Sequence, residues 1–372
     1  MSTRPRPTAA IAALPSTTPF VAPEELARAA GLRALLRLGA NESAFGPPPR
    51  SLAAMRGELE RLAWYGDPSS AELRDALAVR FGCDADNVTV TSGIDDLLGL
   101  IARAYLEPGA VALATAGTYP TFAFHAIGYG ARLEAIPYAT SGAISLDALA
   151  AKACAVGARV VYLANPDNPS GTFRGRAEIE GFVRALPETT LLLLDEAYAD
   201  FVAPAELLAP AIHPRVVRGR TFSKAYGLAG ARIAYALAAP EVGATLQKIR
   251  HHYGVNRNAQ IGALAALDDG AFVAGVVAET ERGRADYVAL GARLGIETLP
   301  SRTNFVCFDG GSRERAETLV ADLLRRGVFI RKPNVAPLDR YVRVSVGTPE
   351  ERARFADIFA QSLAELPAAA RT

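Results

Sequence analysis

Four short apolar runs in this chain end in turns that carry glycine or polar side chains, and this pattern constrains the fold more than any other feature. The runs cover residues 88–91, 111–114, 160–164 and 191–194. Continuous apolar strands of this kind are typical of parallel sheets whose two faces are both covered by helices. Ligands bind such open α/β sheets at the carboxyl ends of the strands. We therefore expect an α/β fold in which a mainly parallel sheet is sandwiched by helices and the four turns meet around one site.

The bulk composition limits the kind of protein and partner. A length of 372 residues suits one large domain and a smaller one. The net charge of +1, without a basic cluster, disfavours nucleic acid as a partner. Cys83, Cys154 and Cys307 are odd in number and far apart, which indicates reduced thiols, and the four histidines show no metal-ligand spacing. With Pro15 ending a short alanine-rich run and no apolar run of membrane-spanning length, we expect a soluble cytoplasmic protein without a metal.

Lys224, one of only four lysines, stands in a setting suited to covalent chemistry. It follows the apolar-leaning run 216–222 and precedes two glycines. A lysine at a strand end forms a Schiff base with a carbonyl carbon when its surroundings lower its pKa. Ser223 and Arg232 bracket it with a hydroxyl donor and a forked cation, a set that suits a phosphate. The combination indicates pyridoxal phosphate, whereas a plain surface lysine in a turn is the alternative.

Asp195 follows four consecutive leucines at residues 191–194. A carboxylate at the end of a strand buried on both faces is costly unless a cation pairs with it. A protonated pyridine nitrogen is such a cation, and its protonation keeps the cofactor in its electron-withdrawing form. Tyr198 comes three residues later and is placed to reach the phenolic oxygen of the ring. The alternative is that Asp195 only caps the next helix.

Two further strand ends carry features suited to the same cofactor. Gly93 follows the run 88–91 and opens a helix, so that the backbone N–H groups of Ile94 and Asp95 face an anion. Tyr119 follows the run 111–114, where it either stacks on a flat ring or packs in the core.

The third strand end is the most tightly constrained. Residues 165–172 read NPDNPSGT, and their two Asn-Pro steps hold amide side chains, including that of Asn168, at the end of the strand. A purely structural turn does not need this much constraint. We expect the segment to belong to the site.

The chain changes character along its length. We expect an N-terminal arm and part of the small domain over residues 1–45, with 1–22 extended, a large cofactor-binding domain over 46–275 and a small α+β domain over 276–372. Within the large domain, Ser69 and Glu72 have the spacing of a capping box at a helix start. Arg331 and Arg343 fall on expected strands of the small domain, which indicates either anion contacts or internal ion pairs.

In order and spacing these motifs resemble the fold-type I pyridoxal-phosphate enzymes of the class I/II aminotransferase group. The chain is most similar to the histidinol-phosphate aminotransferases, over nearly its full length. The segments that carry the resemblance are residues 40–42, 65–67, 93–95, 118–119, 165–171, 195–198, 223–232 and 343–348.

The resemblance implies a role for each site residue. Lys224 carries the cofactor and shuttles the proton, Asp195 pairs with the pyridine nitrogen, and Tyr119 stacks on the ring. Asn168 and Tyr198 contact the ring oxygen. The phosphate is held by Gly93, Ile94, Asp95, Ser223, Arg232 and, from the neighbouring subunit of a homodimer, Tyr65. The substrate side consists of Arg343, Arg331, Asn41 and Phe20, with Arg331 on a phosphate of the substrate.

The reaction implied by the resemblance converts histidinol phosphate and 2-oxoglutarate to imidazole acetol phosphate and glutamate, a step of histidine biosynthesis. Phe20 stands where the family usually has a substrate-binding tyrosine, and Gly39, Ala234 and Arg352 also depart from its usual residues. An aminotransferase of the same family for aromatic or other amino acids therefore stays open, as does a decarboxylase of the threonine-phosphate type. A non-catalytic carrier or effector domain is the alternative from another class, but the intact Lys224 speaks against it.

Overall fold

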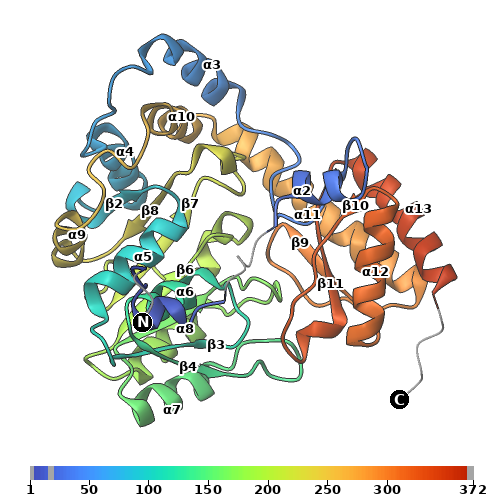
Figure 1. Ribbon diagram of the computed structural model, residues 1–372. Coiled ribbons are helices and arrows are strands. Elements are labelled where there is room, and N and C mark those ends of the chain that lie inside the picture. Colours follow the sequence, from blue (N-terminus) through green and yellow to red (C-terminus); the bar gives the residue numbers. More distant parts are fainter. Residues whose placement is uncertain (1–3, 16–20, 367–372) are drawn as a thin grey trace.

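A seven-stranded sheet forms the centre of the computed structural model, which describes residues 4–15 and 21–366 (Figure 1). Its strand order is β2-β8-β7-β6-β5-β3-β4, in which β8 runs antiparallel to both neighbours and the other pairs are parallel. The expected α/β fold with a mainly parallel sheet is thereby confirmed. The strands are β2 (Val88–Thr91), β3 (Val111–Thr115), β4 (Arg132–Ile136), β5 (Val160–Ala164), β6 (Leu191–Asp195), β7 (Val216–Thr221) and β8 (Ala234–Leu237).

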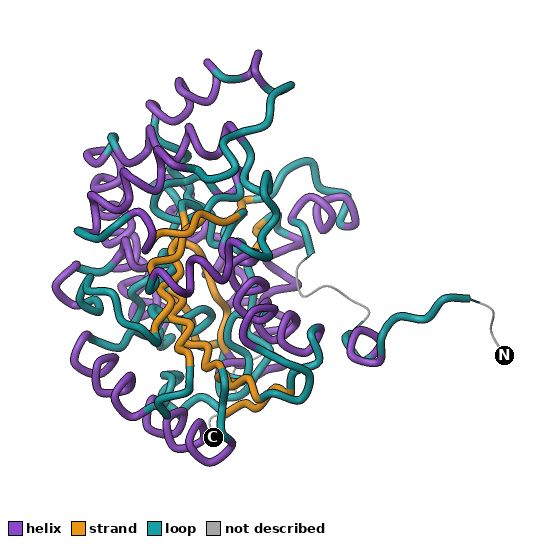
Figure 2. The backbone as a smooth tube through the Cα atoms, turned by 90° about the vertical axis from the view of Figure 1, so that its left-hand side faces the viewer, coloured by secondary structure: helices purple, strands orange, loops and turns teal. Residues whose placement is uncertain are grey.

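Helices cover both faces of this sheet, so that the strands lie between two helical layers (Figure 2). One apolar core contains residues of α4 (Ala71–Phe81), α7 (Leu146–Val156) and α8 (Arg176–Ala185). The core on the opposite face contains residues of α5 (Ile94–Tyr105), α6 (Thr121–Gly128) and α9 (Pro240–Gln247).

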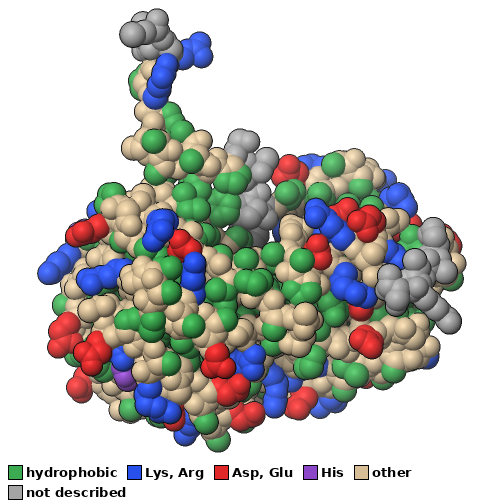
Figure 3. Space-filling view, turned by 90° about the horizontal axis from the view of Figure 1, so that it is seen from below, with side chains coloured by type: hydrophobic (Ala, Val, Ile, Leu, Met, Phe, Trp, Pro, Cys, Tyr) green, Lys and Arg blue, Asp and Glu red, His purple; other side chains and the backbone are tan. Residues whose placement is uncertain are grey.

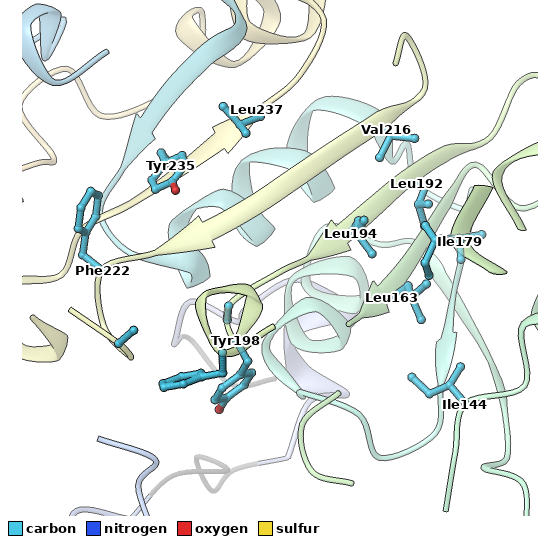
Figure 4. Packing of buried hydrophobic residues seen from close by; sticks show 14 of the residues in the cluster. Ile144, Leu163, Ile179, Leu192, Leu194, Tyr198, Val216, Phe222, Tyr235 and Leu237 are labelled. Carbon is cyan, nitrogen blue, oxygen red and sulfur yellow. The ribbon is translucent and has the colours of Figure 1, made fainter. Parts of the chain in front are cut away.

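Strand β6 shows how the sequence divides between the two cores. All five of its residues are buried, as the four-leucine run predicts. Leu192 and Leu194 lie in the first core, where Figure 4 shows Leu192 close to Leu163 and to Ile179 of α8. Their neighbours Leu191 and Leu193 lie in the opposite core. Because side chains alternate along a strand, residues 195 and 196 also leave β6 toward different faces.

A second group of elements is built around its own core, formed by Tyr287, Phe308, Phe355, Phe359 and their neighbours. Here β9 (Phe305–Asp309) pairs antiparallel with β11 (Tyr341–Ser345), and β1 (Leu36–Arg37) pairs parallel with β10 (Val328–Phe329). The long helix α11 (Gly270–Leu294) reaches from the sheet core to this second core, beside α12 (Arg313–Arg325) and α13 (Pro349–Glu365). The domain boundaries after residues 45 and 275 stay predictions.

The sequence predicts an extended arm over residues 1–22, but part of this segment is helical. Helix α1 (Ala9–Ala12) forms there, with Thr8 as its N-cap. The side chain of Ile11 lies close enough to α6 that a Cβ atom at Gly128 would stand 3.4 Å from it. Apolar contact between this segment and α6 therefore favours a helical turn where composition alone indicated an extended arm. The remaining helices are α2 (Pro23–Ala29), α3 (Pro49–Gly57) and α10 (Arg257–Leu267).

The predicted capping box at the start of α4 is wrong. The helix begins at Ala71, and Ser70 before it has a positive φ of 51° and no side-chain cap hydrogen bond. Asp67 takes the capping role instead, because its carboxylate accepts from the N–H groups of Ser69 at 2.8 Å and Ala71 at 2.6 Å. An ionised carboxylate is a stronger acceptor for these groups than a serine hydroxyl.

The surface shows no large area of one charge on the face drawn in Figure 3, where basic and acidic side chains are intermingled. Among residues 4–15 and 21–366, no single helix is long and apolar enough to cross a membrane. The pair α10 and α11 meets that criterion together by length and composition, but it is bent by 81°.

Candidate active site

The strand ends converge on one cavity of about 220 Å³, as their order along the sequence predicts. Nine of the expected site residues line it: Ile94, Asp95, Tyr119, Asn168, Asp195, Tyr198, Ser223, Lys224 and Arg232. Ala40 and Glu42, from the segment after β1, close another side. The cavity therefore collects side chains from segments more than 180 residues apart.

Lys224 lies just beyond β7, where its Nζ donates to the carbonyl oxygen of Asn41 at 3.2 Å. The same nitrogen lies 5.6 Å from the centre of the Tyr198 ring. Burial, together with the positive charge of Arg343, lowers the pKa of Lys224 to about 8. Such an amine has a larger uncharged fraction near neutral pH than an ordinary lysine, and the uncharged amine is the form that attacks a carbonyl carbon.

Asp195 faces the same cavity and is only 4% exposed. Its Oδ2 accepts from the Tyr162 hydroxyl at 2.8 Å, and its Oδ1 accepts from the N–H of Ala197 at 3.0 Å. Among the described residues, the carboxylate forms no ion pair with lysine or arginine. Burial raises the pKa of Asp195 to about 6. The capping alternative accounts for one oxygen only, and the carboxylate as a whole suits a cation brought by a ligand.

An anion-binding corner lies at the start of α5. Gly93 has a φ of +86°, and a Cβ atom there would stand 2.4 Å from Nη2 of Arg232, so only glycine leaves room for this guanidinium. Arg232 also binds Asp95 at 3.2 Å, and the Tyr119 hydroxyl donates to the other oxygen of Asp95 at 2.7 Å. Ser223 lines the same cavity, so that a guanidinium, a hydroxyl and a helix N-terminus are available to a phosphate.

Arg343 lies in a buried polar cluster next to the cavity. Its guanidinium donates to the carbonyl oxygen of Gly39 at 2.9 Å and to the side-chain oxygen of Asn168. Its Nε is buried without a hydrogen-bond partner among the described residues. Asn41 donates to the Tyr198 hydroxyl at 2.9 Å. Since Arg343 forms no ion pair within the described chain, the internal-ion-pair alternative fails for this residue, and the cluster retains capacity for an anion.

Arg331 lies in an adjoining hollow of about 270 Å³ that also contains Tyr119, Asn168 and Arg343. Its backbone forms an isolated bridge with Arg343, and its side chain donates to the carbonyl oxygen of Val21 at 2.9 Å. Burial and the nearby charge of Arg343 lower the pKa of Arg331. Two neighbouring guanidinium groups thus line a hollow that shares Tyr119 and Asn168 with the Lys224 cavity.

The expected site residue Tyr65 does not line the cavity of its own chain. Tyr65 is 77% exposed, and its ring packs against Tyr253 with centroids 4.4 Å apart. Leu59, Leu62 and Trp64 are exposed beside it in sequence. Phe20 lies outside the described residues, so its expected place at the substrate stays a prediction.

Several buried polar groups around the site were not anticipated from the sequence. Tyr162 in β5 binds Asp195, although it reads as one more apolar member of its run. Asp167 accepts from Tyr138, Thr118 and Ser170 and so ties the strand-end turns to one another. The only available signal was an aspartate between two Asn-Pro steps and a tyrosine inside an apolar strand.

Glu196, next to Asp195, is also buried but lies away from the cavity. Its two oxygens accept from Arg218 at 3.0 Å each, and from Arg220 at 2.8 Å. The signal for this cluster was the pair of arginines inside the predicted strand 216–222. The single negative charge of Glu196 is therefore paired with two buried positive charges inside the fold.

The donor set fits pyridoxal phosphate. The uncompensated carboxylate of Asp195 suits a protonated pyridine nitrogen, and the amine of Lys224 suits an aldehyde carbon. The corner at Gly93 and Arg232 suits the phosphate, because glycine at position 93 leaves room for the Arg232 guanidinium beside the start of α5. Within the described residues, no group of three or more His, Cys, Asp or Glu side chains is arranged to hold a metal ion.

Known proteins resemble the chain over most of its length. The family model of aminotransferases of class I and II matches residues 33–359. Histidinol-phosphate aminotransferase 1 of Thiobacillus denitrificans is 38% identical over 92% of this chain and 90% of its own. The histidinol-phosphate aminotransferase of Symbiobacterium thermophilum is 38% identical over 92% and 94%. A crystal structure of the Sinorhizobium meliloti histidinol-phosphate aminotransferase in complex with pyridoxal-5'-phosphate is 41% identical, with a TM-score of 0.94 over 98% of this chain and 100% of that one.

Proposed function

The chain belongs to the class I and II aminotransferases, which are pyridoxal-phosphate-dependent enzymes, and from that premise we propose that its amino donor is histidinol phosphate. The amino group passes to 2-oxoglutarate, and the products are imidazole acetol phosphate and glutamate, as in histidine biosynthesis. Support comes from relatives of that name at 38% identity over most of both chains. The cofactor assignment was expected from the sequence, and family membership confirms it.

Each residue of the cavity has a part in the proposed reaction. When bound, pyridoxal phosphate supplies an aldehyde carbon for the substrate amine and a conjugated ring that accepts electrons. Asp195 would keep the ring nitrogen protonated, and Tyr119 would contact the ring. Lys224, with its lowered pKa, would accept the proton from the substrate carbon that bears nitrogen and give it back later in the reaction. Cofactor contacts are also proposed for Gly93, Ile94, Asp95, Asn168, Tyr198, Ser223 and Arg232.

The residues assigned to the substrate would determine which amino donor the enzyme uses. Arg343 and Arg331 line the hollow next to the cavity from paired backbone positions, an arrangement suited to anionic groups. We assign Arg331 to the phosphate of histidinol phosphate and Arg343 to anchoring either substrate. Substrate contacts are also proposed for Asn41 and Phe20. The adjacency of the two arginines is the observation that carries this assignment.

A substrate panel tests the donor. With 2-oxoglutarate as acceptor, kcat/KM should be highest for histidinol phosphate, and the ester should be favoured over histidinol by at least about a hundredfold, about 2.7 kcal/mol. Arg331→Met should remove most of this preference while leaving turnover of phenylalanine within about threefold, since phenylalanine has no phosphate. A preference for phenylalanine or tyrosine would instead establish the aromatic alternative, for which Phe20 is the reason. Carbon dioxide release without 2-oxoglutarate would establish a decarboxylase.

Covalent attachment is tested at Lys224. The reconstituted protein should absorb near roughly 410–430 nm, and borohydride should fix the cofactor on this residue. Lys224→Ala should bind cofactor but lose at least about a thousandfold in kcat, because both the attachment and the proton carrier are gone. Lys248→Ala, an ordinary lysine after α9, is the matched control and should keep full activity. Full activity of Lys224→Ala would refute the site.

We also propose a homodimer in which Tyr65 reaches the cofactor phosphate of its partner. The exposed ring and its exposed apolar neighbours support this, because Tyr65 does not line the cavity of its own chain. Mixing inactive Lys224→Ala chains with weakened Tyr65→Ala chains should restore one intact site per mixed dimer. Each mixed dimer should then have about half the activity of a wild-type dimer. Without any rise on mixing, Tyr65 would act in its own chain or in none.

A cytoplasmic location completes the proposal. Cys83, Cys154 and Cys307 are all free, which agrees with a reducing compartment.

A further inference from the structure

Tyr162 lies beneath the cavity and is buried almost completely, with 1% of its surface exposed. Its hydroxyl donates to Oδ2 of Asp195 at 2.8 Å. Its ring stacks on Phe122 of α6, with centroids 5.2 Å apart and planes 14° from parallel. Stacking on Phe122 and attachment to β5 therefore hold the ring of Tyr162 in place, and this fixes the position of its hydroxyl.

The sheet register explains why Tyr162 reaches this carboxylate. Ala164 of β5 is the direct partner of Asp195 in β6, and Tyr162 stands two residues earlier on the same face. Apart from the N–H of Ala197, this hydroxyl is the only hydrogen-bond donor to the carboxylate of Asp195 among the described residues. Without it, one carboxylate oxygen would be buried with no donor from the protein.

We propose that Tyr162 is a positioning residue that keeps Asp195 ionised and aimed at the ring nitrogen of the cofactor. This inference rests on the proposed function, because it needs a bound pyridine ring. A hydrogen bond donated to a carboxylate favours its charged form. The proton shared by carboxylate and ring nitrogen then stays on the nitrogen, where it makes the ring electron-withdrawing.

A second buried tyrosine–aspartate pair, comparable with Tyr162 and Asp195, exists elsewhere in the fold. Tyr138 is also buried and donates to a buried carboxylate, Oδ2 of Asp167, at 3.0 Å. Asp167, however, does not line the cavity, and it keeps Thr118 and Ser170 as further donors. Tyr138→Phe therefore removes the same chemical group from the same kind of partner without touching the carboxylate that faces the ring.

The direct test measures the ring nitrogen itself. Holoenzyme reconstituted with ¹⁵N-labelled pyridoxal phosphate should give a pyridinium resonance in the wild type and in Tyr138→Phe. In Tyr162→Phe, which keeps the stacked ring, the resonance should move toward the unprotonated position. A wild-type protein that does not bind the cofactor would refute the proposed function. A wild-type resonance in Tyr162→Phe would overturn only this inference.

Kinetics separate positioning from general packing. Tyr162→Phe should lower kcat about tenfold with KM changed less than about twofold, as expected for one hydrogen bond to a charged group. On an Asp195→Asn background the same change should have no further effect, because Tyr162 acts through Asp195. Multiplicative losses in the double variant would show an independent structural role. Should Tyr162→Phe not fold, 3-fluorotyrosine at 162 keeps the ring and supplies a stronger hydroxyl donor. A ¹⁵N resonance that moved toward the unprotonated position with this donor would count against the inference.

Discussion

Asp195 and Glu196 are neighbours in sequence, are almost equally buried at 4% and 2% exposure, and have opposite electrostatic environments. Asp195 receives two neutral donors, and burial raises its pKa to about 6. Glu196 is bound by two guanidinium groups of β7, and although burial raises its pKa, Arg220 and Arg218 outweigh that effect and leave it below its ordinary value.

The difference follows from the alternation of side chains along a strand. One carboxylate points to the face with the cavity and the other to the opposite face, where the two arginines lie. The carboxylate of Glu196 is paired with two arginines of β7 and so links β6 to β7. The carboxylate of Asp195 is left for a cationic ligand. A buried acid without a protein cation is thus a better guide to a site than burial alone.

The largest effect is expected on stability, from Glu196→Gln. It leaves two buried guanidinium groups without their counter-ion, and loss of one partner of a buried ion pair costs about 3–5 kcal/mol in the free energy of unfolding. Urea unfolding of the cofactor-free protein measures this. Asp195→Asn is the control and should unfold at the same urea concentration as the wild type or a higher one. Equal midpoints for both variants would show that the two carboxylates do not differ as described.

The effects on catalysis should have the reverse order, with a larger loss of kcat in Asp195→Asn than in Glu196→Gln. Asp195→Asn should lower kcat about a hundredfold to a thousandfold, about 3–4 kcal/mol, because the ring nitrogen loses the anion that keeps it protonated. Glu196→Gln, assayed per folded molecule at low temperature, should stay within about threefold of the wild type. Steady-state rates with saturating cofactor provide the comparison. Near-full turnover by Asp195→Asn would remove the assigned role of this residue.

The pH dependence of stability should have opposite signs at the two positions. The pKa of Asp195 is raised to about 6 in the folded protein, so its contribution is complete below about 4 and is lost as pH rises through 6, by about 3 kcal/mol. The pKa of Glu196 is lowered, so its contribution is present above its ordinary value and is lost as pH falls. Cofactor-free wild type should therefore lose stability relative to Asp195→Asn as the pH rises from about 4 to 7. Relative to Glu196→Gln it should instead lose stability as the pH falls below about 4.5. Parallel pH profiles would contradict both assignments.

The smallest effect concerns the outer side of the arginine cluster. The guanidinium of Arg220 lies 5.0 Å from the centre of the Phe81 ring. Phe81→Leu should cost about 0.5–1 kcal/mol for the lost cation–π contact beyond the change in packing, and it should leave cofactor binding unchanged. Comparing its effect in the wild type and in an Arg220→Met background isolates the contact. An identical cost in both backgrounds would show that the ring only fills space.

Much of the fold and the site could be predicted because the signals are local. An apolar run followed by glycine, proline or asparagine specifies a strand and its end, and each predicted run forms a strand that ends at the cavity. Lys224 and Asp195 were recognisable because an amine and a carboxylate at such ends are costly without a ligand. The local rule failed at Ser69, where Asp67 competed for the same N–H groups.

The sequence by itself determined the strands, the turns and the chemical identity of the groups at their ends, since these depend on residues a few positions apart. Only the tertiary structure decided which groups meet. The contact of Tyr162 with Asp195 spans 33 residues, and that of Lys224 with Asn41 spans 183. Such contacts depend on the register between strands and on how segments pack across the sheet, and neither leaves a periodic signal in the chain.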